Sequence, residues 1–163
     1  TQACALGGVT TVIHLIHTGE ALREAAQDFI DVYQKNGFVD LALTMALHTP
    51  QQVDQLQSVA DFGILGFKFS LPYRGSENIL GFPPLDDGIV YLGFQEIGRL
   101  ARQGYKVHAR VHCENVEIFF RLKERFLAQG LEPAFWHDTR PNFCEAESML
   151  RCIYLAQMTD CPL

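Results

Sequence analysis

Short runs of apolar and β-branched residues alternate along the chain with longer stretches in which apolar residues recur every three or four positions. The short runs predict buried strands and the longer stretches predict amphipathic helices. The predicted strands are Val9–Ile16, Val39–Leu47, Ile64–Leu71 and Lys106–His112. Alternation of this kind is typical of βαβ units, so we expect an α/β fold with a parallel sheet.

End signals support the predicted helices. Thr49-Pro50-Gln51-Gln52 reads as a capping box with proline in the first turn of a helix that runs to about Ala60. Asp86 and Asp87 suit the positive end of another helix, and Gly37 is predicted to be a left-handed C-terminal cap. The predicted helices are Glu20–Asn36, the segment after Thr49, Leu85–Arg102 before Gly104, Val116–Ala128 before Gly130, and Glu145–Gln157.

Composition allows one ordinary domain with a real core, since 48% of the 163 residues are hydrophobic. The net charge is −6 and the 13 Lys and Arg are scattered, so no basic stripe predicts nucleic acid as a partner. No apolar run approaches the ~20 residues that cross a bilayer. We therefore expect a soluble, cytoplasmic protein with neither membrane nor nucleic-acid partners.

The cysteines are odd in number and show no Cys-x-x-Cys spacing, which predicts neither a disulfide framework nor a zinc ribbon. We expect reduced thiols that fill core space. They are Cys4, Cys113, Cys144, Cys152 and Cys161.

One lysine stands out in the predicted third strand. Lys68 lies between Phe67 and Phe69 and follows Ile64 and Leu65. Burial would favour its neutral amine. Taken alone, such a lysine is more often an edge residue that reaches for water, so the chemistry needs support from other motifs.

Four motifs in order supply that support. Ala5–Ile13, Gly66–Tyr73, Val111–Asn115 and Thr139–Ser148 together resemble the cyclic amidohydrolases, and within them the dihydropyrimidinase and hydantoinase group. The resemblance covers nearly the whole chain. It implies βα units that form about half of a TIM-type (β/α)8 barrel, a fold that typically needs ~250 residues.

The resemblance also implies a metal centre. Lys68 would react with carbon dioxide to give a carbamate that bridges two divalent metal ions, and His112 would bind one of them. Zinc suits such ligands, with manganese and cobalt as alternatives. A binuclear centre of this kind activates hydroxide for attack on a cyclic amide or imide ring, such as a hydantoin or dihydropyrimidine.

Tyr73 matches a family tyrosine whose hydroxyl stabilises the oxyanion, and its spacing from Lys68 favours hydantoinase over allantoinase or dihydroorotase. Pro72 departs from the family pattern and could move that hydroxyl, and loop packing is an equal alternative for Tyr73. Glu114 and Asn115 are expected to cap the next helix or hold the strand end, with support of His112 as the lesser option.

Other polar residues receive structural interpretations. His14 and His17 are three positions apart in a strand, which places them on opposite faces and argues against a ligand pair. His108 shares a face with His112 and is expected in the core. Arg140 and Glu145 are expected to tie a loop to the barrel, and His137 has no assigned role.

The segment 1–163 is expected to be a partial barrel domain of about four βα units. The family's His-x-His pair, a further histidine and an aspartate have no counterpart here, so we expect the segment alone to be inactive and Lys68 unmodified. Exposed sheet edges predict a homo-oligomer. The alternatives are a non-catalytic dihydropyrimidinase-related protein that acts through protein contacts, and a complete small α/β binding module.

Overall fold

The structure is a computed structural model that describes residues 1–19, 21–73, 81–130 and 136–163. Its sheet has four strands in the order β1-β2-β3-β4, and all neighbouring strands are parallel. They are β1 (Thr11–Ile16), β2 (Asp40–Ala46), β3 (Gly66–Ser70) and β4 (His108–His112). Each falls inside its predicted range, so the parallel α/β fold is confirmed.

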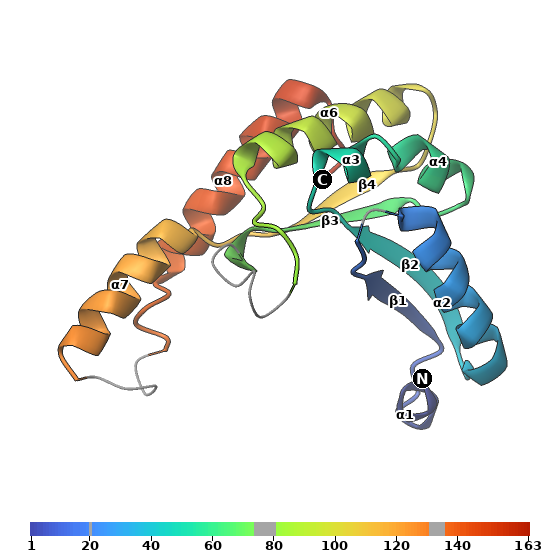
Figure 1. Cartoon of the computed structure of the whole chain (residues 1–163), viewed down its shortest axis with the longest axis horizontal. Coiled ribbons are helices and arrows are strands. Elements are labelled where there is room, and N and C mark those ends of the chain that lie inside the picture. The colour runs from blue at the N-terminus through green and yellow to red at the C-terminus, as the bar shows by residue number, and fades with distance from the viewer. Residues whose placement is uncertain (20, 74–80, 131–135) are drawn as a thin grey trace.

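Helices follow each strand in the predicted order, and one further short helix precedes β1 (Figure 1). They are α1 (Gln2–Leu6), α2 (Leu22–Asn36), α3 (Pro50–Val53), α4 (Leu56–Asp61), α6 (Asp87–Arg102), α7 (Val116–Ala128) and α8 (Asn142–Thr159), with a 3-10 turn, η1 (Leu71–Tyr73), after β3. None of the described helices is long and apolar enough to cross a bilayer.

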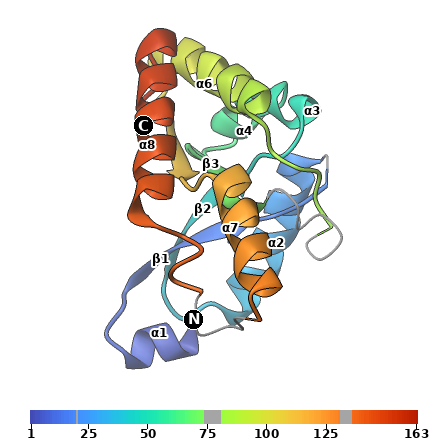
Figure 2. The same cartoon turned by 90° about the vertical axis from the view of Figure 1, so that its left-hand side faces the viewer.

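The helices α2, α3, α4 and α6 lie on one face of the sheet, as the two views in Figures 1 and 2 show. Phe67 and Phe69 of β3 are fully buried, and the Phe69 ring meets Phe94 of α6 edge to face at 5.4 Å. The core lies between β3 and these helices. Because side chains alternate along a strand, Lys68 leaves β3 on the opposite face.

One end signal acts differently from the prediction. Gly37 is not a left-handed cap, because its φ of −76° and ψ of 141° are extended. Space explains the glycine instead, since an added Cβ would lie 2.4 Å from the Tyr33 ring. Gly104 and Gly130 do adopt positive φ, at 97° and 70°.

The segment after Thr49 also differs from the single predicted helix. The capping box is present, with Thr49 Oγ1 accepting from the Gln52 N–H and the Gln52 side chain accepting from the Thr49 N–H. The helix ends at Val53, however, and α4 begins only at Leu56. Apolar residues keep their helical spacing across this break, so the sequence pattern predicted one helix where the structure has two.

The last helix begins earlier than predicted, because α8 starts at Asn142 rather than Glu145. After α8 the chain turns back along β4, and the Ala109 N–H donates to the Pro162 carbonyl at 2.7 Å. The residues that follow α8 therefore accept a backbone hydrogen bond from the outer edge of β4.

Candidate metal centre

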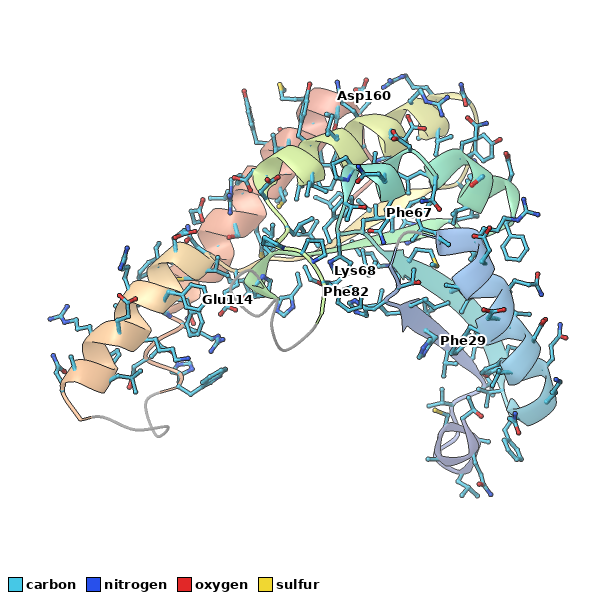
Figure 3. All side chains as sticks on the ribbon, in the orientation of Figure 1. Phe29, Phe67, Lys68, Phe82, Glu114 and Asp160 are labelled. Carbon is cyan, nitrogen blue, oxygen red and sulfur yellow. The ribbon has the colours of Figure 1, made fainter. Side chains whose placement is uncertain are left out.

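Lys68 and His112 lie on the same face of the sheet. The register pairs Lys68 with Arg110 and Ser70 with His112, and paired residues in adjacent parallel strands point the same way. Both strands end at this edge, where βα proteins gather their functional side chains. Figure 3 shows Lys68 directed away from the helices and Phe67 directed toward them.

The amine of Lys68 is in an unfavourable place for a charge. The side chain is half-buried, and burial lowers its pKa, with the charge of Arg110 adding to the effect and Cys113 opposing it. Burial also lowers the pKa of His112, as does the nearby Lys68 charge. A neutral amine and a neutral imidazole are the forms that carbon dioxide and a metal ion, respectively, require.

The two side chains line one cavity of about 500 Å³. Glu145 of α8 also lines it, together with Cys113 and Cys152. We expected Glu145 only to tie a loop, but the structure brings its carboxylate side chain to the same cavity as Lys68 and His112. The sequence signal was weak, because Glu145 lies far along the chain from both.

The residues after His112 brace the strand end. Asn115 caps α7, as expected, by accepting from the Ile118 N–H at 3.2 Å, and it also donates to Glu147 at 2.7 Å. Glu114 Oε1 lies 2.9 Å from Arg140 Nε. The carboxylate of Glu114 raises the pKa of His112, although burial and Lys68 outweigh it.

Arg140 holds its loop by stacking as well as by charge. Its Cζ lies 3.8 Å from the centre of the Phe119 ring and 3.7 Å from that of Trp136. With the Glu114 ion pair, these contacts fasten the loop before α8 to the residues after β4. The structural interpretation of Arg140 is therefore confirmed.

Tyr73 is the last residue of η1, and its side chain lies outside the described residues, so its catalytic role stays a prediction. His108 accepts from Arg110 Nε at 3.1 Å, on the same face as His112 and nearer the start of β4. His14 stacks on Phe29 of α2 at 4.3 Å and is structural, as expected.

His17 was assigned a structural role, but it lies on the face that carries Lys68. The prediction that His14 and His17 point to opposite faces is correct, and His17 is the one directed away from the helices. Nδ1 of His17 is 3.2 Å from Nε2 of His48, and the Lys68 charge contributes, after burial, to lowering the pKa of His17. Extending the strand alternation to β2 could have identified this pair.

A complete metal site is not assembled by the described residues. No group of three or more His, Cys, Asp or Glu among them is arranged to hold a metal ion. Lys68 and His112 fit the donors that a binuclear centre needs at two positions, so this part of the chain could contribute only a share of its ligands.

Comparisons with known proteins agree with this architecture. A D-hydantoinase of Rhizobium radiobacter is 28% identical over 168 residues, which cover all of this chain and 34% of that protein. An allantoinase of Desulfitobacterium hafniense (strain DSM 10664 / DCB-2) is 33% identical over 135 residues, covering 81% of this chain and 28% of that protein. A solved D-hydantoinase structure matches 98% of this chain and 34% of its own, with a TM-score of 0.82 and 25% identity.

The chain belongs to the cyclic amidohydrolases. It spans about a third of the length of these relatives, and its four parallel βα units correspond to part of their TIM-type barrel. No family model matches the chain. The relatives include both hydantoinases and allantoinases, so the preference for a hydantoinase ring stays a prediction.

Proposed function

We propose that this cyclic amidohydrolase chain contributes Lys68 and His112 to a binuclear metal centre that opens a cyclic amide or imide ring, a hydantoin or a dihydropyrimidine. The observation that carries the proposal is that both side chains share a face, a strand edge and a cavity. Two divalent ions, with zinc preferred, would supply hydroxide and polarise the ring carbonyl when bound.

The chain's own residues do three things in this proposal. Burial keeps the Lys68 amine in reach of its neutral form, which can add carbon dioxide to become an anionic ligand. His112 presents a neutral imidazole to a metal, with Glu114 and Asn115 supporting the strand end. Tyr73 would donate its hydroxyl to the oxyanion.

The experiment measures metal content and ring opening of hydantoin and dihydrouracil by the whole protein that contains this chain. Lys68→Ala and His112→Gln should each lower bound metal and abolish turnover. His108→Gln is the matched control, because it changes another histidine of β4 on the same face and should retain metal. Unchanged metal content in both Lys68→Ala and His112→Gln would contradict the proposal.

The segment 1–163 by itself is proposed to be inactive, a partial barrel domain with an unmodified Lys68 amine. Two protein ligands do not make an open catalytic site. Ring opening by the purified segment with added zinc, or the added mass of a carboxyl group on Lys68, would show this to be wrong.

A non-catalytic, dihydropyrimidinase-related role is the second candidate. One observation favours it: α8 exposes large apolar side chains, with Leu150 at 69% and Tyr154 at 60%. Such a surface suits contacts between copies of the chain, and we propose a soluble, cytoplasmic homo-oligomer in either case. Metal-free whole protein that still assembles but opens no ring would favour this second role.

A further inference from the structure

A second pair of side chains lies on the Lys68 face, at the ends of the other two strands. His17 follows β1 and His48 follows β2, and Nδ1 of His17 is 3.2 Å from Nε2 of His48. His48 is buried, at 5% exposure, whereas His17 is exposed. One imidazole is thus fixed inside the protein and the other is reachable from solvent.

A buried glutamine fixes the two loops that carry these histidines. Gln52 is 1% exposed, and its Oε1 accepts from the backbone N–H groups of His48 at 2.6 Å and Thr49 at 3.2 Å. Its Nε2 donates to the carbonyls of Thr18, at 3.2 Å, and Gly19. The amide therefore joins the loop after β1 to the loop after β2 and sets the spacing of the two imidazoles.

An aromatic ring covers the pair. Phe82 stacks on His48 with ring centres 4.6 Å apart and planes 8° from parallel, and its centre is 5.2 Å from that of His17. Figure 3 shows Phe82 and Lys68 on the side of the sheet away from the helices. The face of the His48 ring is used in stacking and the His17 ring is tilted by 35° to Phe82, while one nitrogen of each ring is directed at the other ring.

The two nitrogens are within hydrogen-bond distance of each other, and their spacing is also that of two ligands on a single metal ion. Two imidazole nitrogens, each 2.0–2.1 Å from a tetrahedral zinc ion, lie about 3.3 Å apart. Burial, and then the neighbouring His17, lower the pKa of His48 to about 4, so its ring is neutral at physiological pH. Neutral imidazole is the form that binds metal.

We propose that His17 and His48 form a chelating pair for a divalent transition metal such as Zn²⁺ or Ni²⁺, distinct from the Lys68 and His112 centre. The metal would take Nδ1 of His17 and Nε2 of His48, with each ring keeping its one proton on the other nitrogen. Imidazole suits these ions. No third His, Cys, Asp or Glu completes a cluster in the described part of the chain, so the pair would supply two ligands and leave the other positions open to water.

The test is a Zn²⁺ titration of the 163-residue chain, followed by calorimetry and by imidazole ¹⁵N–¹H spectra. The spectra should show Zn²⁺ on Nδ1 of His17 and Nε2 of His48. His17→Gln changes an exposed residue and should weaken Zn²⁺ binding at least about tenfold. That factor is the smallest usually seen when a residue that only hydrogen-bonds to a metal ligand is removed. His48→Gln should do the same where circular dichroism shows that it folds.

Two matched variants separate this site from others. His14→Gln lies on the same strand but faces α2, and His112→Gln removes the proposed ligand of the other centre. Both should bind Zn²⁺ at the His17 and His48 nitrogens as the parent chain does. Binding that survives His17→Gln, or that disappears in His112→Gln, would overturn the proposal. Neither result depends on ring-opening activity, so this proposal and the proposed function can fail separately.

Discussion

β1 and β3 belong to one parallel sheet, yet they sit in different surroundings. In β3 the residues Phe67 and Phe69 are fully buried against the helices, and Lys68 on the other face is half-buried. In β1 three of the six side chains are exposed, among them Ile13 at 55%, and only Ile16 is buried. An inner strand and an edge strand therefore give similar apolar patterns in sequence but very different burial.

The difference also applies to function. The lysine of β3 stands out because it interrupts a buried apolar run. His17 follows β1, a strand with exposed side chains, so it does not stand out in the same way. Its partner His48 lies 31 positions away in the sequence. A polar side chain on a buried strand can thus be recognised as functional from the sequence. One on an edge strand can be recognised only when the fold shows which side chain lies beside it.

The largest expected effect compares the two strands directly. Phe69→Ala should lower the free energy of unfolding by about 3–5 kcal/mol, because it leaves a cavity beside Phe94 that the core cannot fill. Urea denaturation measures the change. Ile13→Ala in β1 is the counterpart and should cost less than about 1 kcal/mol. Equal losses would mean that the two strands are equally buried.

The second prediction concerns pH and the buried end of β2. His48 has a folded-state pKa of about 4 and an ordinary value of 6.5, so the unfolded chain takes up a proton that the folded chain resists. Stability should be full above about pH 6.5 and fall as the pH decreases toward 4, by up to about 3 kcal/mol for this group.

Urea midpoints at pH 4 to 7, with a metal chelator present, measure the loss. His48→Gln should remove that part of the pH dependence, since the variant has no imidazole to protonate. His14→Gln, stacked on the helix face, should keep the parent's profile. A His48→Gln profile identical to that of the parent chain would show that His48 is not the responsible group.

The third prediction tests the close packing of α6 against the end of α8. A Cβ added at Gly98 of α6 would lie 2.1 Å from the Thr159 carbonyl at the end of α8. Gly98→Ala should therefore push α6 and α8 apart and cost about 1–3 kcal/mol. Gly19→Ala, after β1, meets no atom within 4 Å and should change the unfolding free energy by less than about 0.5 kcal/mol.

The smallest expected effect is at the capping box between the two halves of the sheet. Thr49→Ala removes the acceptor for the Gln52 N–H and should cost about 1 kcal/mol. Gln51→Ala in the same turn is exposed and should be nearly neutral. Thermal unfolding of both variants beside the parent chain would show the difference, and equal midpoints would argue against the cap.

Local chemistry let the sequence determine the strands, some of the helix ends and the unusual lysine. β-branched runs, the Thr49 capping box and the charge of Lys68 among phenylalanines each act over a few residues, so each can be read without the fold. Gly37 shows the limit of this approach. A glycine is needed at position 37 because a Cβ would collide with the Tyr33 ring, and not because the backbone has positive φ. A glycine that follows a predicted helix looks the same in the sequence in either case.

Only the tertiary structure decided which side chains meet. The register of four strands places Lys68 and His112 on one face, brings Glu145 of α8 to the same cavity, and sets His17 against His48. Register depends on the packing of the sheet against its helices, which sums many weak contacts between distant residues. No single stretch of sequence contains that sum, so the second histidine pair became visible only in the folded chain.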